Sequence, residues 1–402
     1  MRTVAQHLEA CLAQVGPLPP LEVLLPDAVG CILAEDVASP FDLPVTDVST
    51  IDGYAVRSVD IAGASADEPV YLRVIDEVRA GDVDPTSVIA ETAVRIASGA
   101  PVPAGADAVV DLEDTDRDES NVQIKKLSLP GQNIRPRASD VEAYQNVLQE
   151  GQRIGARQIA LLAGVGRLRV LVHPHPRVVV MSIGDELVEP GRIASPGAVF
   201  DANGHALAAA VADAGADTFR VNAVPDEHRI LRQTIEDQLV RADLLITTGG
   251  LSYGAGDTVK EVLSPLGTVR FDSVAIAPGK HMGVGTVEDT PIFCLPGDPV
   301  TAQICYEVFV RPALRSMAGW SELYRTALTA RVDRGWASPA GKREFVRVAL
   351  SGAPAEGYVA SVCGDPKDRL LSKLTEANAL AVVPEDVTEV RAGDELVCMV
   401  LD

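Results

Sequence analysis

Three short glycine-containing segments combine the residue types that bind anions. They cover residues 182–186, 247–257 and 295–299, and each follows an apolar run typical of a buried strand. Glycine lets backbone N–H groups approach a ligand closely, and the N-terminus of a following helix carries partial positive charge. One such turn is equally well explained as a tight turn. Three turns at the carboxyl ends of one parallel sheet would form a ligand-binding cleft.

Three carboxylates accompany these turns. Glu186 ends the first turn, Asp257 stands where a helix should begin, and Asp226 lies in the run Val-Pro-Asp-Glu-His at 224–228. Asp226 and Asp257 are also good helix N-cap residues, and that interpretation stays open. If the turns converge, carboxylates beside phosphate-binding amides indicate a magnesium-assisted site for a phosphorylated ligand. Glu186, Asp226 and Asp257 are then the expected metal ligands.

A cation is needed as well, and Lys280 in the run Ala-Pro-Gly-Lys-His at 277–281 is the first candidate. The three histidines His205, His228 and His281 are better explained as surface or turn residues. The residues expected to contact the substrate in this part of the chain are Ser182, Gly184, Thr248, Gly249, Gly250, Ser252, Gly279, Lys280, Pro296, Gly297 and Asp298.

The elements that must position these residues follow from hydrophobic periodicity. Between about 168 and 317, apolar runs at 178–182, 244–248 and 292–295 alternate with helix patterns near 203–214, 226–241, 256–264 and 299–317. Continuous apolar strands alternating with amphipathic helices predict a doubly wound parallel α/β domain. A further strand is expected over 268–276, just before Lys280.

The flanking regions have a different pattern. Residues 46–140 show short strands, at 70–75, 92–97 and 121–125, and a helix is expected at 156–162. After Gly319 the runs at 328–332, 345–350, 358–362 and 396–401 read as strands of a small all-β domain. The N-terminal segment, with Val4, Leu8, Cys11, Leu12 and Val15 at helical spacing, predicts an amphipathic helix and not a signal peptide.

Composition narrows the classes of partner. The chain has 402 residues, a formal net charge of −22 and a pI of about 4.7, a field that repels nucleic acid and anionic membranes. No apolar run reaches the roughly 18 residues that span a bilayer. The six cysteines are scattered without a Cys-x-x-Cys pair, which indicates buried thiols in a reducing cytoplasm and no zinc site.

Motifs along nearly the whole chain resemble the molybdopterin molybdenumtransferase family, which includes MoeA proteins and the E domain of gephyrin. Ser-Thr-Ile-Asp-Gly-Tyr-Ala-Val at 49–56 is similar to the family's Ser-x-Met-Asp-Gly-Tyr-Ala-Val. Further matching blocks, in the family's order, lie at 96–110, 131–135 with Asp140, 182–187, 248–250, 278–280 and 295–299.

The resemblance implies an α/β multidomain fold. Its parts are a split helical domain (1–45 and 141–167), a β-rich domain (46–140), a molybdopterin-binding α/β domain (168–318) and a C-terminal β-barrel (319–402). It also implies an elongated homodimer, with the cleft between the α/β domain of one subunit and the β-rich domain of the other.

The implied reaction inserts molybdate into adenylated molybdopterin with Mg²⁺ and releases AMP and molybdenum cofactor. By position, the implied acidic set is Asp52, Asp140, Glu186, Asp226 and Asp257, with Ser98 in place of the family's threonine.

Several positions depart from the family's motifs. Ile183 stands in place of threonine, Ala277 of lysine, Asp298 of asparagine and Ser139 of glutamate. Ala277 removes a positive charge and Asp298 adds a negative one near an anionic substrate, whereas Ser139 removes a negative charge. An alternative is therefore a gephyrin-like dimeric scaffold that binds a peptide from a membrane receptor or a tubulin-like division protein. A third reading is that the protein only binds a pterin.

Overall fold

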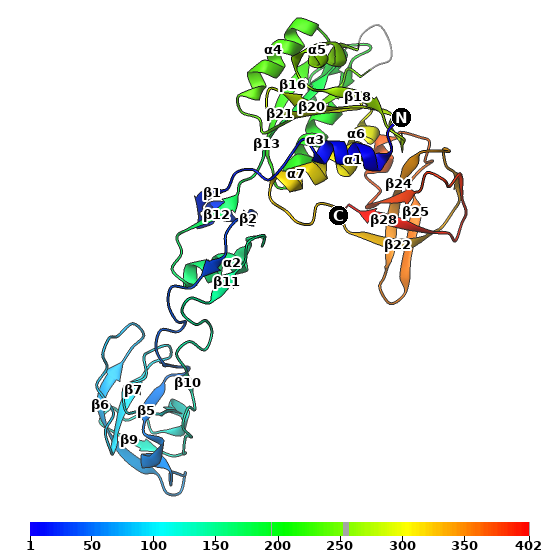
Figure 1. Ribbon diagram of the computed structural model, residues 1–402. Coiled ribbons are helices and arrows are strands. Elements are labelled where there is room, and N and C mark those ends of the chain that lie inside the picture. Colours follow the sequence, from blue (N-terminus) through cyan, green and yellow to red (C-terminus); the bar gives the residue numbers. More distant parts are fainter. Residues whose placement is uncertain (194, 252–256, 402) are drawn as a thin grey trace. The chain divides into compact units, whose positions relative to one another are not determined.

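The computed structural model describes residues 1–193, 195–251 and 257–401 and divides the chain into two compact units. One unit comprises residues 1–34 and 170–402, and the other comprises residues 35–169. The chain therefore crosses between the units twice (Figure 1). In the described part of the chain, no helix has the length and apolar character needed to cross a membrane.

The first unit contains an α/β domain around a six-stranded sheet. The strand order is β16-β13-β17-β21-β20-β18, and the pairs from β16 to β21 are parallel. Its strands are β13 (Arg177–Ile183), β16 (Asp217–Val224), β17 (Leu244–Gly249), β18 (Arg270–Ser273), β20 (His281–Val287) and β21 (Thr290–Leu295). The predicted doubly wound domain is confirmed.

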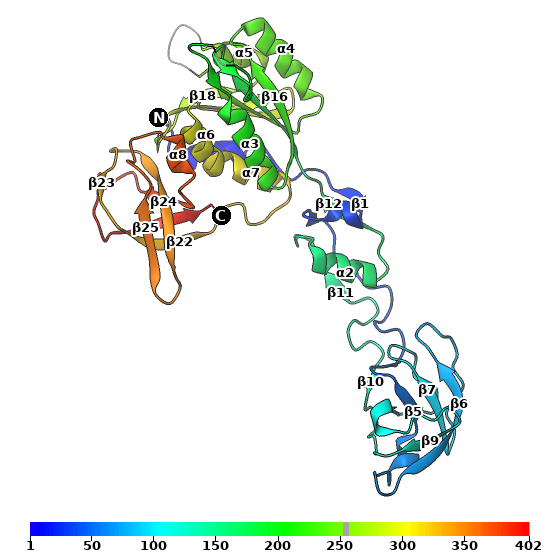
Figure 2. The same ribbon diagram turned by 180° about the vertical axis from the view of Figure 1, so that it is seen from behind.

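Helices cover both faces of this sheet. They are α3 (Ala202–Asp213), α4 (His228–Leu239), α5 (Thr258–Leu266), α6 (Pro299–Cys305), the π-helical turn η4 (Tyr306–Val310) and α7 (Arg311–Met317). Figure 2 shows α4 and α5 on one side of the sheet, with α3, α6 and α7 on the other. The helix expected at 299–317 is thus continuous, with a π-helical middle.

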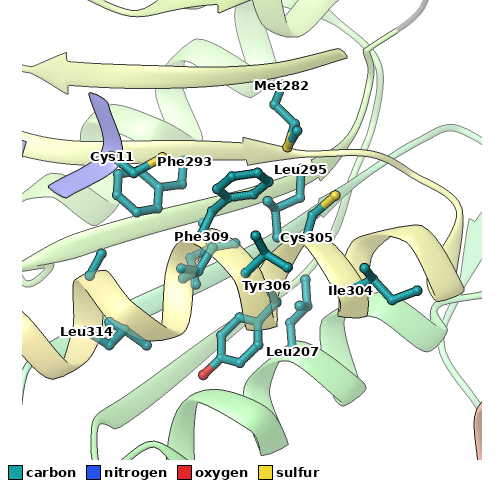
Figure 3. Packing of buried hydrophobic residues seen from close by; sticks show 14 of the residues in the cluster. Cys11, Leu207, Met282, Phe293, Leu295, Ile304, Cys305, Tyr306, Phe309 and Leu314 are labelled. Atoms are coloured by element: carbon teal, nitrogen blue, oxygen red, sulfur yellow. The ribbon is translucent and has the colours of Figure 1, made fainter. Parts of the chain in front are cut away.

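Alternate residues of β13 show how the domain is packed. Val178 and Val180 belong to the core cluster beneath α3, α6 and α7, whereas Val179, Met181 and Ile183 belong to the cluster beneath α4 and α5. Successive side chains of a strand point to opposite faces, so a strand covered on both faces must be apolar throughout. In Figure 3, aromatic side chains of the α6–α7 region pack on β21 in the first of these clusters.

The N-terminal helix α1 (Val4–Leu12) packs on the same core. Thr3 and Gln6 form a capping box at its start, and Val4 and Cys11 are buried. The helix contacts α7 (Figure 1). The predicted amphipathic helix is confirmed, and the unit that contains the α/β domain includes it. The boundaries of the four-domain division stay a prediction.

The C-terminal region forms a closed barrel. Strands β24, β25, β22, β28 and β26 pair in that order, and β26 pairs back with β24. The elements of this region are β19 (Ile276–Ala277), β22 (Ala327–Val332), β23 (Trp336–Ala337), β24 (Arg343–Ala353), β25 (Gly357–Val362), α8 (Leu371–Leu374), β26 (Ala379–Val383), β27 (Glu389–Val390) and β28 (Glu395–Val400). The predicted small β-barrel is confirmed. The strand expected over 268–276 is interrupted between β18 and β19.

The second unit is β-rich, as predicted for residues 46–140. Its five-stranded sheet has the order β8-β5-β7-β6-β9. The elements of this unit are β3 (Val37–Ala38), β4 (Val48–Ser49), β5 (Gly53–Val56), η2 (Ser58–Ile61), β6 (Val70–Val78), β7 (Thr92–Ile96), β8 (Ala108–Asp111), η3 (Leu112–Asp114), β9 (Asn121–Ile124), β10 (Ile134–Arg135), β11 (Asn146–Leu148) and α2 (Ala156–Gly164).

Several short elements complete the first unit. They are β1 (Leu21–Leu24), η1 (Leu25–Ala28), β2 (Ile32–Leu33), β12 (Arg169–His173), β14 (Leu187–Val188) and β15 (Val199–Phe200). Strand β12 lies between β1 and β2 in a three-stranded sheet. All six cysteines are buried free thiols, as expected.

Candidate functional site

The three predicted turns meet at one edge of the α/β sheet. Ile183 at the end of β13 pairs with Gly249 at the end of β17, and Thr248 pairs with Leu295 at the end of β21. Because these strands are parallel neighbours, the turns that follow them lie side by side. This edge is where open α/β sheets bind ligands.

Glycine is required here because the backbones approach each other. Gly249 has φ +89°, and a Cβ added there would lie 2.3 Å from the carbonyl oxygen of Ile183. A Cβ on Gly250, at φ +65°, would lie 2.4 Å from the Cγ2 atom of Val259. Across the edge, a Cβ on Gly297 would lie 3.2 Å from the Cα atom of Gly249. The second and third turns are therefore in direct contact.

A buried polar network holds the turns together. The Thr248 hydroxyl donates to the Pro296 carbonyl at 2.8 Å, and the Asn203 side-chain amide donates to Thr248 Oγ1 at 3.0 Å and to the Gly297 carbonyl at 2.8 Å. The Ser182 hydroxyl donates to Asp201 Oδ1 at 2.7 Å. Ser182 and Thr248, expected to contact the substrate, thus use their hydroxyl hydrogens inside the protein.

Sequence reasoning missed Asp201 and Asn203. Asp201 caps α3 by accepting from the Gly204 amide at 2.8 Å, and its second oxygen lies 3.5 Å from Arg220. The available signal was an Asp followed by a helical pattern, which is a common N-cap arrangement. Their place at the site depends on Ser182 and Thr248, which are distant in the chain.

Several buried side-chain oxygens at this edge have no hydrogen-bond partner among the residues that the structure describes. They include Asn203 Oδ1, Asp226 Oδ1 and Asp257 Oδ1. A buried polar atom left without a partner costs about 1–3 kcal/mol. Such atoms suit a site that a bound ligand completes.

The N-cap interpretation is wrong for Asp226, whereas Asp257 does stand at the N-cap position of its helix. Helix α4 has Glu227 at its N-cap position, so Asp226 lies one residue outside the helix. Asp257 occupies the N-cap position of α5 but makes no side-chain capping hydrogen bond. Burial raises the pKa of Asp257, with Lys260 acting in the opposite direction.

Contacts between loops bring the segments that carry the three carboxylates to neighbouring positions. The Gly184 amide donates to the Val224 carbonyl at 3.0 Å, and the Asp226 amide donates to Asp185 Oδ1 at 2.9 Å. A Cβ on Gly184 would lie 2.5 Å from a carboxylate oxygen of Glu186, so that carboxylate folds back over the turn.

The starts of α4 and α5 are joined as well, because His228 Nε2 lies 2.6 Å from Glu261 Oε2. Asp226 precedes His228 by two residues, and Asp257 precedes Glu261 by four.

Across the described ranges, no three His, Cys, Asp or Glu side chains gather closely enough to hold a metal ion by themselves. Glu186, Asp226 and Asp257 therefore do not form a ready-made set of three metal ligands. Mg²⁺ usually keeps several waters and takes only one or two carboxylates together with substrate phosphates. The unpaired oxygens of Asp226 and Asp257 fit that mode.

Asp298 has a structural use that the sequence interpretation did not give it. Its Oδ1 accepts from the Thr301 amide at 2.8 Å and from the Thr301 hydroxyl at 2.6 Å, which caps α6. Gly279, at φ +120°, packs close to Thr301. The segment that carries Lys280 thus lies against the start of α6. The Lys280 side chain is exposed.

A pocket of about 380 Å³ adjoins this segment. Its lining residues are Ala277, Pro278, Ala337, Ser338, Pro339, Glu344, Pro366, Lys367 and Arg369. The Ser338 hydroxyl is buried and makes no hydrogen bond to a described residue. Lys367 and Arg369 place positive charge beside Ala277, where the family's motif has lysine.

Asp52, Ser98 and Asp140 belong to the second unit. Asp52 Oδ1 accepts from the Ser98 amide at 2.8 Å, so the structure brings these two residues together. A Cβ on Gly53 would lie 2.0 Å from the Val110 carbonyl oxygen, which explains the Asp-Gly pair. Asp140 forms an ion pair with Arg135 at 3.2 Å. All three site residues are exposed.

Ser252, expected to contact the substrate, lies outside the residues that the structure describes.

The fold and this edge together define a class: multidomain α/β proteins with a glycine-rich sheet edge and a C-terminal barrel. Comparison with known proteins places the chain within it. The MoeA N-terminal region (domain I and II) matches residues 2–166, a probable molybdopterin binding domain matches 179–316, and the MoeA C-terminal region (domain IV) matches 329–401.

Relatives match over the whole chain. Molybdopterin molybdenumtransferase 2 of Mycobacterium tuberculosis is 40% identical over 402 residues, which cover 98% of each chain. Molybdopterin molybdenumtransferase of Nostoc is 33% identical over 93% of this chain and 87% of its own.

A crystal structure of a molybdopterin biosynthesis MoeA protein from Pyrococcus horikosii agrees in fold. It has a TM-score of 0.83 and 30% identity, and the match covers 100% of this chain and 99% of that one. The chain belongs to the molybdopterin molybdenumtransferase (MoeA) family, a family of transferase enzymes.

Proposed function

We propose that this chain inserts molybdate into adenylated molybdopterin and releases AMP, which yields molybdenum cofactor. The observation that carries the proposal is the sheet edge itself. Glycine backbones, a buried hydrogen-bond network and carboxylate oxygens without partners among the described residues lie together there. The relatives' names supply the substrate class.

The substrate's phosphates would be bound by main-chain amides of the turns after β13, β17 and β21, with Lys280 as the nearest cation in the sequence motif. Ala277 and Asp298 weaken this charge balance. Lys367 and Arg369, which line the pocket beside Ala277, offer compensating positive charge. An oxyanion that enters this pocket would meet two cations and the buried Ser338 hydroxyl, and also the Glu344 carboxylate, which accepts a hydrogen bond from Trp336.

The carboxylates divide the chemistry between them. Asp226 and Asp257 would hold Mg²⁺ together with substrate phosphates, and the ion would supply charge neutralisation at the phosphoanhydride. Glu186, exposed above Gly184, would orient the attacking oxyanion. Buried donors and charges placed before the reaction need no reorganisation during it, which is why such groups lower the barrier.

A homodimer is part of the proposal. Asp52, Ser98 and Asp140 of one copy would serve the site of the other, since each is exposed and matches the family's motif. The cytoplasm is the proposed location. The scaffold alternative, with a receptor or tubulin-like partner, stays a prediction to which no observation in the described structure adds support.

The test is restoration of molybdoenzyme activity in a bacterial strain that lacks its molybdenum insertase. We expect the natural chain to restore activity and Asp257→Ala to abolish that restoration. Asp289→Ala is the matched control, because Asp289 is exposed in the turn between β20 and β21, at the opposite edge of the sheet. A folded natural chain that restores nothing would contradict the proposal.

A further inference from the structure

Cys31 and His175 form a side-chain pair outside the candidate site. Cys31 Sγ lies 3.4 Å from His175 Nε2. The other ring nitrogen, Nδ1, is hydrogen-bonded to the Gly215 carbonyl oxygen, which acts only as an acceptor. Nδ1 therefore carries a proton, and Nε2 is the atom that exchanges a proton with the thiol. A nucleophile, a base and a group that orients the base are the three parts of an activated thiol.

The pair lies in an open pocket of about 390 Å³ formed by residues of the first unit. Its lining residues are Leu18, Pro19, Leu21, Val23, Asp27, Cys31, Val172, Pro174, His175, Arg177, Asp217 and Asp243. Hydrogen bonding to Cys31 raises the pKa of His175 to about 9, with burial opposing and Asp217 contributing.

The other cysteines provide an internal comparison. Cys363 has an exposed fraction of 7%, against 5% for Cys31, and burial raises the pKa of its thiol. Burial also raises the pKa of Cys11 and Cys294 to about 12, and that of Cys398 to about 11. Within the described ranges, none of these thiols is hydrogen-bonded to an imidazole, as Cys31 is. Cys31 and Cys363 thus differ little in exposure, and Cys363 has the charged neighbours Glu376, Arg347 and Lys373 in place of an imidazole.

The charges that line the pocket determine whether it favours a cationic or an anionic reagent. Arg177 and Asp243 form an ion pair at 2.8 Å, which leaves the carboxylates of Asp27 and Asp217 as the remaining charges besides the Cys31–His175 pair. A cationic ligand is therefore favoured over an anionic one at low ionic strength.

We propose that Cys31, activated by His175, is a modification site that takes up small disulfides bearing amines. The Cys31 thiolate attacks one sulfur of the disulfide, the Cys31–sulfur bond forms and the disulfide bond breaks. The leaving thiolate takes the proton from His175 Nε2. Cys31 is oxidised to a mixed disulfide, and half of the reagent is reduced to a free thiol. This inference does not depend on the proposed transferase reaction.

The experiment treats the reduced full-length chain with cystamine and, in parallel, with the anionic 3,3′-dithiodipropionate. Peptide mass spectrometry then follows the mixed disulfides at Cys31 and Cys363 over time. At pH 7 we expect Cys31 to react at least about tenfold faster than Cys363, because His175 Nε2 lies 3.4 Å from the Cys31 sulfur and can exchange a proton during the reaction. Cystamine should react faster than the anionic reagent, and added salt should reduce that preference.

His175→Gln tests the role of the imidazole. We expect the rate at Cys31 to fall by about tenfold at pH 7 and to rise tenfold per pH unit, as for an unassisted thiol. The natural chain should show a different pH profile, because the raised pKa of His175 makes its proton exchange with Cys31 depend on pH as well. Cys363→Ser should leave the Cys31 rate unchanged.

Equal rates at Cys31 and Cys363 in the natural chain would overturn the proposal, and this comparison needs no variant to fold. An unchanged rate and pH profile in folded His175→Gln would overturn the role of His175. Faster reaction with the anionic reagent would exclude the proposed ligand class.

Discussion

The sheet edge and the barrel differ in how far their buried polar groups are hydrogen-bonded within the protein. In the barrel, the buried Arg347 guanidinium donates to the carbonyls of Asp365, Asp368 and Leu370 at 2.6–3.1 Å. At the sheet edge, buried oxygens of Asp226 and Asp257 find no partner among the described residues. The barrel loop is complete by itself, whereas the edge has bonding capacity left for a ligand.

The pocket beside Ala277 shows both kinds of buried polar group. Ser338 belongs to the barrel region, yet its buried hydroxyl makes no hydrogen bond to a described residue, and it lines the pocket beside Ala277. Within the same pocket, Glu344 accepts from Trp336 Nε1 at 3.0 Å. The comparison therefore predicts that changes to the unpaired polar side chains of the edge alter function more than stability, while changes to the buried polar side chains of the barrel do the reverse.

The largest effect should come from closing the contact between the turns. Gly249→Ala adds a Cβ 2.3 Å from a carbonyl oxygen at a positive φ. Left-handed strain and overpacking together should lower the free energy of unfolding by about 4 kcal/mol. Gly393→Ala in the barrel is the control, because Gly393 has φ +92° with no atom within 4 Å of the added Cβ.

Urea unfolding of the two glycine variants measures the difference. Gly393→Ala should lose only about 1–2 kcal/mol, from strain alone. Equal losses in the two variants would show that the close approach at the edge has no energetic consequence.

Arg347→Ala should give the next largest effect, and its effect should be on stability. The substitution leaves three carbonyls without their donor, and charge-assisted hydrogen bonds contribute about 1.5–3 kcal/mol each. We expect a loss of about 3 kcal/mol in urea unfolding followed by tryptophan fluorescence, with Trp336 as the reporter in the barrel. Arg347→Lys keeps the charge but not the fork of donors, and should recover only part of the loss. If Arg347→Ala unfolds at the same urea concentration as the natural chain, the buried hydrogen bonds of the barrel do not stabilise it, and the contrast with the sheet edge is wrong.

Asp257→Asn should reverse that pattern. Molybdenum insertion should fall by on the order of 100-fold, the scale seen when one charge-stabilising group is removed. Stability at pH 7 should stay the same or rise slightly, because burial raises the pKa of this carboxyl above its usual 3.8. A carboxyl with a raised folded pKa loses stability as pH rises through that window, so an uncharged amide removes the penalty.

Unfolding measured between pH 3 and 7 checks the sign of this effect. The natural chain should lose more stability across that range than Asp257→Asn does. A clear destabilisation of the variant at pH 7, with activity retained, would mean that Asp257 is a structural residue.

The sequence predicted the elements whose residues need only local context. The runs that became β13, β17 and β21 are apolar throughout, because both faces of these strands are covered. Strand β20 was missed, since Gly283 and Gly285 disguise its pattern. A Cβ on Gly283 would lie 2.6 Å from Phe271, and one on Gly285 would lie 2.5 Å from the Cα atom of Val269. Glycine is required at both positions because a neighbouring segment packs closely against them. The local sequence pattern does not reveal that segment.

Like the fold, the site could be predicted only where the residues depend on local sequence context. The turns follow from glycine spacing and strand ends, and their shared edge is confirmed by the strand register. The grouping of the carboxylates into one site stays a prediction. Asp201 and Asn203 were missed because their partners, Ser182 and Thr248, lie 19 and 45 residues away. Asp298 was read only as a charge near the substrate, although Thr301 three residues later makes it a helix cap.

The smallest expected effect separates these two uses of Asp298. Asparagine caps helices about as well as aspartate, so Asp298→Asn should change stability by only a few tenths of a kcal/mol. It removes one negative charge from the edge and should improve the apparent affinity for an anionic pterin by roughly two- to fivefold at low salt. Asp289→Asn removes the same charge at the opposite edge and should leave the affinity unchanged. Titration of both variants with the pterin at two salt concentrations tests this prediction. Equal affinities of Asp298→Asn and Asp289→Asn would mean that the Asp298 charge acts only in capping the helix.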